Sequence, residues 1–396
     1  MKKPTYAKRV ELLQESTTIA ISTLARELKA SGQDVLSLSA GEPDFDTPEM
    51  IKNEAIRALK SGFTKYTAVV GIPELIESIR GKLLRENNLQ YESNEIIVSN
   101  GAKHSLFNVF QALINNGDEV IIPSPYWVTY PELVTFSGGK PVIVQTTEAN
   151  NFKITAKELK EAITSKTKIF VLNTPSNPTG MVYSKEELES LAEVLKDTNI
   201  WVVSDEMYEK LVYSVKFFSA AAVSEDMLQR TITINGLSKS VAMTGWRIGY
   251  LACKDKKLIK FMDNLQSQCT SNINSITQKA SAIALKGEVD NDIEDMRTAF
   301  EERMRFACDA INNIQSLNVR QPQGAFYLFI NISALPQYGA DSMGFCKALL
   351  KEQGVALVPG CAFGMEGFVR LSFACSLEEL EEGIARIEQF VKALFK

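Results

Sequence analysis

The sequence has a single histidine, His104, among its 396 residues. Zinc sites built on pairs of histidines are therefore excluded, and only His104 could act as the base of a Ser-His-Asp triad. Chemistry in this chain must otherwise rely on lysine, tyrosine, carboxylates or a cofactor. We expect His104 to be a packing residue on a helix, and we predict no metal site.

Other absences exclude whole classes of partner. No apolar run approaches the roughly 18 residues that are needed to cross a bilayer. Asp and Glu together number 48 against 43 Lys and Arg, and the net charge of −5 offers no basic surface to nucleic acid. The sequence therefore predicts neither a membrane nor a nucleic-acid partner.

Three further features bear on location and chemistry. The six cysteines are scattered without C-x-x-C spacing, which is typical of reduced thiols in a cytoplasmic protein. The first residues, "MKKPTYAKRVELLQ", carry positive charge but no apolar core, so we expect no secretory signal there. No G-x-G-x-x-G follows any strand candidate, which argues against a nicotinamide-dependent dehydrogenase.

The middle of the chain alternates short apolar runs with longer segments of helical periodicity. The runs are bounded by polar turns, like strands buried on both faces of a sheet; they are "EIIVS", "DEVIIPSP", "KPVIVQT", "TKIFVLNTP", "NIWVVSDE" and "TITINGLSK". One intervening segment begins with a capping box of Ser184 and Glu187. This pattern predicts an α/β domain with helices covering a mostly parallel sheet.

The last third of the chain changes character. A charged helical stretch around residues 292–312 precedes the apolar segments "GAFYLFINI", "VALVPG" and "GFVRLSFA". The final segment is predicted to be a helix packed on one side, because apolar residues recur at spacings of three and four; they are Leu377, Leu380, Ile384, Ile387, Val391 and Leu394. We predict a large α/β domain over residues 48–285 and a smaller α+β domain formed by residues 1–47 and 286–396.

Polar residues follow the expected strands where these strands end. Open α/β sheets bind their ligands at this edge. The candidates there are residues 100–103, Tyr126, Trp127, residues 177–180, Asp205, Tyr208 and Lys239. Each has an alternative explanation, since "NPTG" is a good turn sequence and an aspartate after a strand is often a helix cap. Their gathering at one predicted crevice nevertheless favours a shared binding site.

One end of this crevice suits a phosphate. Gly101, Ala102 and Lys103 at a helix N-terminus would offer backbone N–H groups to an anion. Arg247 would supply a second, charged clamp.

The other end suits an aromatic ring that carries an aldehyde. Trp127 can stack on a planar ring, and Asp205 can pair with a protonated ring nitrogen. Asn177 and Tyr208 can donate hydrogen bonds to a ring oxygen. Lys239 can bond covalently to an aldehyde. A phosphate, a pyridine ring, a phenolic oxygen and an aldehyde together describe pyridoxal 5′-phosphate, which we predict as the cofactor.

The chain resembles the fold-type I, class I aminotransferases that depend on pyridoxal phosphate, and among them most closely the bacterial aspartate and aspartate/prephenate enzymes. The resemblance covers nearly the whole chain, from "SLSAGEPDFDTPEMI" (37–51) and "KYTAVVGIPEL" (65–75) to "GFVRLSFA" (367–374), and includes "SPYWVTYPE", "NTPSNPTG", "VVSDEMYE", "MTGWRIGY" and "QGAFY". It implies a large cofactor-binding domain with a mostly parallel, seven-stranded sheet and a smaller α+β domain. It also implies a cytoplasmic homodimer with shared active sites.

The resemblance implies roles for individual residues. Lys239 would be the Schiff-base lysine and the proton carrier, and Asp205 would keep the pyridine nitrogen protonated. Further implied ligands of the cofactor are Tyr208, Asn177, Gly101, Ala102, Lys103, Trp127, Ser238, Arg247 and, reaching into the neighbouring subunit, Tyr66. Arg370 would bind the α-carboxylate of the substrate through its planar fork. Other implied substrate contacts are Gly41, Trp127 and Asn177, with Lys103, Ser16 and Thr18 on the side of a second carboxylate.

The implied reaction is transfer of the amino group of L-aspartate to 2-oxoglutarate by a ping-pong mechanism. Prephenate, aromatic amino acids and alanine stay open as substrates, because Lys239 and Arg370 read features that all amino acids share. β-Elimination or decarboxylation with the same cofactor also stays open. A regulator that binds the cofactor would carry an added DNA-binding domain, for which the chain offers no basic module.

Overall fold

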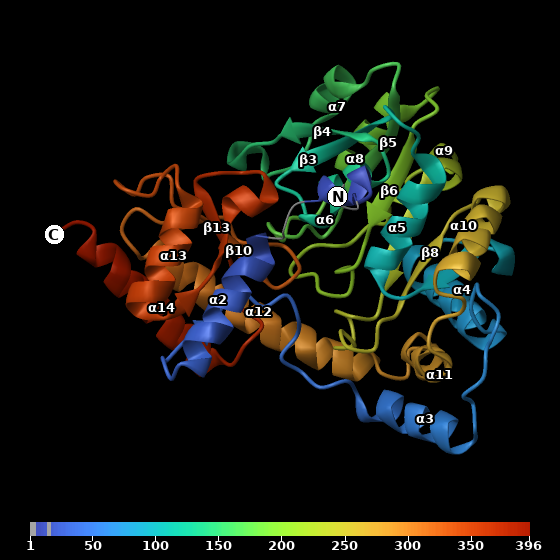
Figure 1. Cartoon of the computed structure of the whole chain (residues 1–396), viewed down its shortest axis with the longest axis horizontal. Helices are drawn as coiled ribbons and strands as arrows, with labels where there is room; N and C mark the ends of the chain where they lie inside the picture. Colours follow the sequence, from blue (N-terminus) through green and yellow to red (C-terminus); the bar gives the residue numbers. More distant parts are fainter. Residues whose placement is uncertain (1–4, 14–16) are drawn as a thin grey trace.

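A seven-stranded sheet lies at the centre of the computed structural model, which describes residues 5–13 and 17–396, with the backbone alone for residues 17–20 and 22 (Figure 1). Its strand order is β2-β8-β7-β6-β5-β3-β4. All six expected strands form: β2 (Ile96–Ser99), β3 (Glu119–Ser124), β4 (Lys140–Gln145), β5 (Thr167–Asn173), β6 (Trp201–Asp205) and β7 (Thr231–Gly236). The predicted α/β fold is confirmed.

The seventh strand, β8 (Gly249–Ala252), runs against its two neighbours. Leu251 pairs with Ile97 of β2 on one side and with Ile234 of β7 on the other, both antiparallel. The pairings among β3 to β7 are parallel. The sheet is therefore mixed but mostly parallel, in agreement with the resemblance.

Helices cover both faces of this sheet. They are α3 (Glu49–Lys60), α4 (Pro73–Asn87), α5 (Ala102–Leu113), α6 (Thr129–Phe136), α7 (Ala156–Ala162), α8 (Lys185–Leu195), α9 (Glu225–Arg230), α10 (Lys256–Cys269) and α11 (Ser275–Ala284). Along β5, Ile169 and Val171 pack in one core cluster, whereas Phe170 and Leu172 pack in another with α7 and α8. This alternation explains why the strand sequences are apolar throughout.

The C-terminal part forms a smaller α+β unit. Its elements are α12 (Asp290–Asn312), β9 (Asn318–Val319), β10 (Tyr327–Asn331), α13 (Ser342–Gln353), β11 (Val355–Ala356), β12 (Val358–Pro359), β13 (Phe368–Ser372) and α14 (Leu377–Ala393). Strands β12, β13, β10 and β9 form an antiparallel sheet in that order. The stripe of α14 is buried from Leu380 to Val391, but the prediction was wrong for Leu377, which is the first residue of the helix and 42% exposed.

From α2 onward, the N-terminal segment lies against the C-terminal part, as Figure 1 shows for the blue helix α2 and the orange helix α13. It contains α1 (Lys8–Glu11), α2 (Thr17–Ala30) and β1 (Leu36–Ser37). Strand β1 pairs in parallel with β11, with Leu36 opposite Val355 and Ser37 opposite Ala356. This contact agrees with joining β1 to the C-terminal part, but α1 instead contacts α6 of the large α/β part, with the Arg9 Cζ 5.9 Å from the centroid of the Phe136 ring. The boundaries at residues 48 and 285 stay a prediction.

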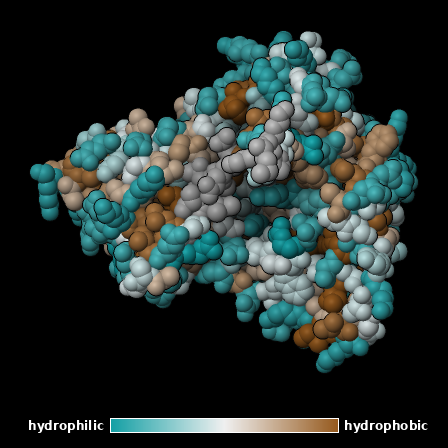
Figure 2. Space-filling view, in the orientation of Figure 1, coloured by the Kyte–Doolittle hydropathy of each residue, from teal (hydrophilic) through white to brown (hydrophobic). Residues whose placement is uncertain are grey.

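Hydrophilic residues dominate the face of the molecule seen in Figure 2, but hydrophobic ones gather over α3. Met50, Ile56 and Leu59 of this helix are all exposed. Within the described residues no helix is both long and apolar enough to cross a membrane, and no cluster of His, Cys, Asp or Glu could hold a metal ion.

Candidate active site

A cavity of about 540 Å³ lies at the edge where the parallel strands end, and the small sheet closes it from the other side. Most of the predicted site residues line it: Gly41, Ala102, Lys103, Trp127, Asn177, Asp205, Tyr208, Ser238, Lys239, Arg247 and Arg370. These residues come from distant parts of the sequence, so the fold gathers in one cavity residues expected from the strand ends and residues expected only from the resemblance, among them Gly41, Ser238 and Arg370.

At one end of the cavity, the N-terminus of α5 meets Arg247. The helix begins at Ala102, and Gly101 before it has a φ of +86°, which favours glycine. A Cβ at Gly101 would lie 2.4 Å from Arg247 Nη2, and a Cβ at Gly249 would lie 2.4 Å from Ala102 N. The two glycines thus let the guanidinium and strand β8 approach the first N–H groups of the helix, which have no intrahelical acceptors.

Arg247 itself has a left-handed backbone, with a φ of +57°. A non-glycine residue in this conformation costs about 1–2 kcal/mol. Its Nη1 donates to the carbonyl oxygen of Thr244 at 2.9 Å. The turn therefore holds the guanidinium beside the helix N-terminus, where two sources of positive potential add up.

Asp205 ends β6 with its carboxylate buried, at 3% exposure. Oδ2 accepts a hydrogen bond of 2.7 Å from the Tyr130 hydroxyl, and Oδ1 accepts one of 3.3 Å from the Met207 N–H. Burial raises the pKa of Asp205 to about 6, although both hydrogen bonds favour the charged form. A cation placed next to this carboxylate would be strongly favoured, because it would restore the charge that burial disfavours.

Lys239 is a half-buried amine without a carboxylate partner within 4 Å among the described residues. Its Nζ donates to the carbonyl oxygen of Gly41. Burial lowers the pKa of Lys239 to about 8; Glu42 opposes the shift, and Arg247 and Arg370 add to it. At pH 7 about a tenth of this amine is therefore neutral, and hence nucleophilic, far more than for a lysine with its ordinary pKa near 10.4.

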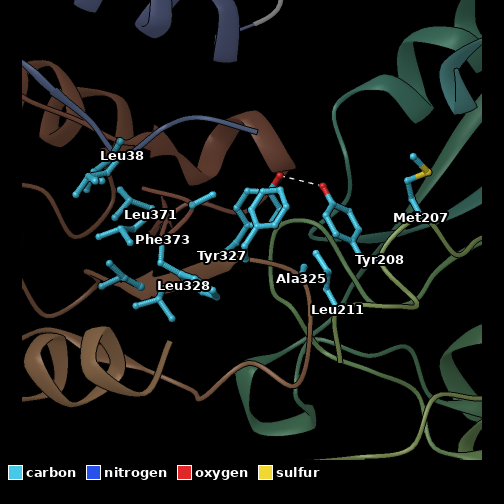
Figure 3. Close-up of a cluster of buried hydrophobic side chains, with 14 of the residues drawn as sticks. Leu38, Met207, Tyr208, Leu211, Ala325, Tyr327, Leu328, Leu371 and Phe373 are labelled. Carbon is cyan, nitrogen blue, oxygen red and sulfur yellow. Dashed lines mark hydrogen bonds between the residues drawn. The ribbon is translucent and has the colours of Figure 1, made fainter. Parts of the chain in front are cut away.

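Tyr208 and Tyr327 point toward each other from the two sheets, as Figure 3 shows. Their hydroxyl oxygens lie 2.9 Å apart. Tyr208 follows β6, whereas Tyr327 begins β10. Burial raises the pKa of both phenols, so both are neutral and each can donate one hydrogen bond.

Arg370 is a buried guanidinium, at 5% exposure, on strand β13. Its Nη1 donates to Asn177 Oδ1 at 2.9 Å and its Nη2 to the Ser39 carbonyl oxygen at 3.1 Å, while Nε has no partner among the described atoms. Burial lowers the pKa of Arg370, because no described carboxylate lies within 4 Å to compensate its charge. The arrangement suits an incoming carboxylate far better than the surface ion pair that is a common role of arginine.

A second cation, Lys103, lies across the Trp127 ring. The Lys103 Nζ is 5.1 Å from the centroid of that ring. Burial, aided by the charge of Arg247, lowers the pKa of Lys103. Trp127 in turn packs edge-on against Tyr130 at 5.6 Å. The aromatic and cationic groups at this side are thus held together as one unit.

The remaining predicted residues fall into three groups. Gly101 adjoins the cavity behind Arg247, and Ser238 lines it while almost fully buried. Tyr66 is 90% exposed and does not reach the cavity of its own chain. Ser16 lies outside the described residues, and Thr18 lies in α2 with its side chain undescribed.

His104 packs on α5 and does not line the cavity. Its Nδ1 accepts a hydrogen bond of 3.1 Å from the Asn100 N–H, and burial lowers the pKa of the imidazole. The placement agrees with the expected packing role.

Sequence reasoning missed about half of the cavity lining. The missed residues are Arg26, Ser37, Ser39, Ala40, Glu42, Tyr130, Asn173, Met207, Thr244, Tyr327 and Phe363. Several belong to the quoted segments "SLSAGEPDFDTPEMI", "SPYWVTYPE" and "QGAFY", so the signal was present without an assigned role. Arg26 carried no such signal, because it lies in the middle of an ordinary helix.

Comparison with known proteins decides the family. The family model described as "Aminotransferase class I and II" matches residues 33–387. The chain belongs to this family. Membership makes it an aminotransferase and implies pyridoxal phosphate as its cofactor.

Similar aminotransferases cover the whole chain. The aspartate aminotransferase of Bacillus sp. (strain YM-2) is 49% identical over 393 residues, which are 98% of this chain and 100% of the relative. The probable aspartate/prephenate aminotransferase of Aquifex aeolicus (strain VF5) is 46% identical, covering 98% of this chain and 99% of the relative. The crystal structure of the aspartate aminotransferase from Rhizobium meliloti matches with a TM-score of 0.94 and 42% identity, covering 98% of this chain and 99% of that one.

The cavity of this aminotransferase fits pyridoxal phosphate by its donor set. A cradle that only glycine permits lies beside Arg247 at the helix N-terminus, which suits a phosphate. Asp205 offers a buried carboxylate to a ring cation, and Lys239 offers an amine to an aldehyde. These features meet the chemical requirements of the cofactor.

Proposed function

We propose that this enzyme is an aspartate aminotransferase that passes the amino group of L-aspartate to 2-oxoglutarate. One observation carries the proposal: Arg370 and Lys103 face the same cavity as Lys239, and neither has a carboxylate within 4 Å among the described residues. Both substrates have two carboxylates, so each cation would receive one. Relatives that are 49–50% identical are named aspartate aminotransferases.

In the proposed complex the protein holds the cofactor from three directions. Arg247, Ser238 and the N-terminus of α5 would bind its phosphate. Asp205 would bind the ring nitrogen, with Trp127 over the ring face. Two further residues, Tyr208 and Asn177, would donate to the ring oxygen. When bound, the cofactor supplies an aldehyde that exchanges amines and a ring that withdraws electrons from the neighbouring carbon.

Lys239 would move the proton of the reaction. Its amine, once displaced from the aldehyde by the substrate, can take the proton from the substrate Cα. A pKa of about 8 lies close to neutral pH, where an amine both accepts and releases a proton readily. The surrounding cations Arg247 and Arg370 help to keep this amine neutral.

The pH dependence of Lys239 can be measured directly. In the cofactor-free protein, the Lys239 amine should condense with a small aldehyde probe half-maximally near pH 8, because the protonated form that prevails at lower pH does not react. Exposed lysines should need a pH about two units higher. Borohydride trapping at a series of pH values, followed by peptide mass analysis, measures both. Labelling of Lys239 that begins at no lower pH than the labelling of the surface lysines as a group would contradict the assignment.

Arg370 would fix the substrate by its α-carboxylate. The planar guanidinium can form two parallel hydrogen bonds to a carboxylate, which the amine of lysine cannot do. Its present partners, the Asn177 amide oxygen and the Ser39 carbonyl oxygen, hold the plane of the group in place. The α-carboxylate is common to all amino acids, so this contact sets orientation and not the choice of side chain.

The choice of a dicarboxylic substrate would rest on Lys103. Replacing Lys103 by Ser should raise the KM for aspartate by about 10- to 100-fold, because the second carboxylate loses a desolvated charged partner. Activity toward phenylalanine should change by less than about threefold. Steady-state kinetics with both donors measures the difference.

The control for Lys103→Ser is Lys216→Ser. Lys216 also lies over an aromatic ring, with its Nζ 5.1 Å from the Phe218 centroid, but it does not line the cavity. Equal losses for aspartate and phenylalanine in the Lys103 variant would contradict its role in specificity.

Prephenate is the second candidate substrate. Relatives that are 45–46% identical over nearly the whole chain are named aspartate/prephenate aminotransferases. Aromatic amino acids remain a further alternative within the same chemistry. Rates with aspartate, prephenate, phenylalanine and alanine under the same conditions decide among them.

We further propose a homodimer in which Tyr66 reaches the phosphate site of the partner subunit. Tyr66 is 90% exposed in its own chain, which is unusual for a large aromatic residue. It follows helix α3, whose exposed Met50, Ile56 and Leu59 form the hydrophobic area visible in Figure 2. Sedimentation of the holoenzyme tests the dimer.

A further inference from the structure

Tyr327 contacts both a proposed ligand of the cofactor and the proposed ligand of the substrate. Its hydroxyl lies 2.9 Å from the Tyr208 hydroxyl, and the Cζ of Arg370 lies 4.2 Å from the centroid of its ring. The side chain is almost completely buried. It is the last residue of the motif "QGAFY".

The contact of Tyr327 with Arg370 lies within the small sheet, whereas its contact with Tyr208 runs between the two sheets. Tyr327 and Arg370 belong to neighbouring strands β10 and β13, in a ladder where Tyr327 pairs with Ser372 and Phe329 with Arg370. Their relative position is therefore fixed within the small sheet. Tyr208 instead follows β6 of the large sheet, and Figure 3 shows its hydroxyl meeting that of Tyr327 across the gap between the two ribbons. The hydroxyl pair thus joins the two sheets.

We propose that Tyr327 is a positioning residue that couples Arg370 to Tyr208. The proposal rests on the proposed function, because it takes Tyr208 as a ligand of the cofactor's ring oxygen and Arg370 as the ligand of the substrate carboxylate.

The coupling follows from the number of protons in the pair. A phenol has one proton to donate. If Tyr208 donates to the ring oxygen, then Tyr327 must donate to the Tyr208 oxygen. Two hydrogen bonds in series polarise each other, so the Tyr327 hydroxyl strengthens donation by Tyr208.

Arg370 acts on these two hydrogen bonds from the Tyr327 end. Its positive charge over the Tyr327 ring draws electrons from the phenol and makes its hydroxyl a better donor. A carboxylate bound to Arg370 offsets that charge, so the hydrogen bonds from Tyr327 to Tyr208 and from Tyr208 to the ring oxygen weaken. Negative charge then stays on the ring oxygen and favours a proton at the neighbouring Lys239 Nζ. Substrate binding would thereby raise the pKa at Lys239, the atom that carries the proton.

The groups that surround the pair support this coupling. Asp205 and Arg370 are the charged residues that act on the Tyr208 phenol. The Lys239 Nζ lies 6.0 Å from the centroid of the Phe326 ring, and this ring packs edge-on against Tyr208. Glu42, Arg247 and Arg370 are the charged residues that act on Lys239 itself. No charged residue is replaced in the variants considered below, so changes in pKa report on the tyrosines.

The test is a pH titration of the visible absorbance of the holoenzyme, with and without succinate, a dicarboxylate that has no amine to transfer. In the wild type, succinate should raise the pKa at Lys239. Tyr327→Phe should raise the pKa of the free holoenzyme by about 0.5 pH unit and reduce the succinate-induced shift by half or more. The succinate Kd should change by less than about twofold, because the ring under Arg370 is kept.

A double-mutant cycle tests whether Tyr327 acts through Tyr208. Tyr208→Phe should raise the pKa more than Tyr327→Phe does, and the double variant should match Tyr208→Phe alone. Tyr213→Phe is the control: Tyr213 is equally buried, but its hydroxyl donates to the Ala325 carbonyl oxygen and does not line the cavity. This variant should leave the pKa and the succinate-induced shift unchanged.

Two results would overturn the coupling while leaving the proposed function intact. They are an unchanged pKa and succinate shift in Tyr327→Phe, and additive effects of Tyr208→Phe and Tyr327→Phe in an enzyme that transfers the amine of aspartate. A wild-type protein with no visible band, or with no transfer from aspartate, would overturn the proposed function itself and the coupling with it.

Discussion

Replacing Lys239 by Ala should abolish amino transfer from aspartate, lowering kcat/KM by at least about 10⁴-fold. Lys239 is the one residue to which the proposed mechanism gives both the covalent attachment of the cofactor and the movement of the Cα proton. Its amine lines the cavity and has a pKa lowered to about 8 by burial. Neither role should pass to Lys103, the other lysine that lines the cavity within the described residues, because its Nζ lies over the Trp127 ring.

Mass analysis of the borohydride-reduced holoenzyme supplies the accompanying measurement, and the label should be found on Lys239. Two other buried lysines serve as internal controls: Lys82 contacts Glu209, and Lys153 contacts Glu187. Both amines contact a carboxylate and lie outside the cavity, so neither should carry the label. A label on another lysine, or an active Lys239→Arg variant, would refute the mechanism.

The second large effect is expected at Asp205. Replacing Asp205 by Ala should lower kcat by about 10³-fold while the enzyme still retains its cofactor. The buried carboxylate would no longer hold the ring nitrogen in its protonated, electron-withdrawing form, so removal of the Cα proton slows. The proposed phosphate ligands, Arg247 and the N-terminus of α5, lie elsewhere in the cavity and are unchanged. Cofactor absorbance per subunit and single-turnover rates with Cα-deuterated aspartate measure the two quantities separately.

Glu206→Gln is the matched control for Asp205→Ala. Glu206 is the next residue and is fully buried, and burial raises its pKa to about 7. Its Oε1, however, accepts hydrogen bonds from Ser204, Ser219 and Ala220, and the residue does not line the cavity. Its loss should change kcat by less than about threefold. Similar losses in both variants would show that the effect comes from disturbing β6 and not from the ring nitrogen.

Local sequence patterns were enough to predict the large sheet and the residues at its edge. Strands buried on both faces are apolar throughout, and polar residues such as Asp205 and Lys239 stand where these runs stop. Strand β8 escaped the pattern because its four residues, "GYLA", include no valine or isoleucine and directly follow a turn that contains Arg247. The antiparallel direction of β8 depends on its pairing with β2 and β7, which no local pattern encodes.

The contacts between side chains could not be predicted in the same way. Tyr130 is one of several apolar or aromatic residues in "SPYWVTYPE", and only the packing of α6 brings its hydroxyl to Asp205. Tyr327 likewise reads as a strand residue, and its contact with Tyr208 exists only because the small sheet faces the large one. The roles of Tyr66, Ser16 and Thr18 stay predictions, since they depend on a second subunit or on side chains that are not described.

The parallel pairing of β1 with β11 has a consequence for how the enzyme is made. Ser37 at the end of this strand and residues 39–42 after it form one wall of the cavity, but the partner strand β11 lies near the opposite end of the chain. The N-terminal segment emerges from the ribosome long before β11 does, so β1 has no partner strand during most of translation. The cofactor can therefore meet a complete set of ligands only in a finished polypeptide. A product that is truncated before β11 would leave the ribosome without a working site.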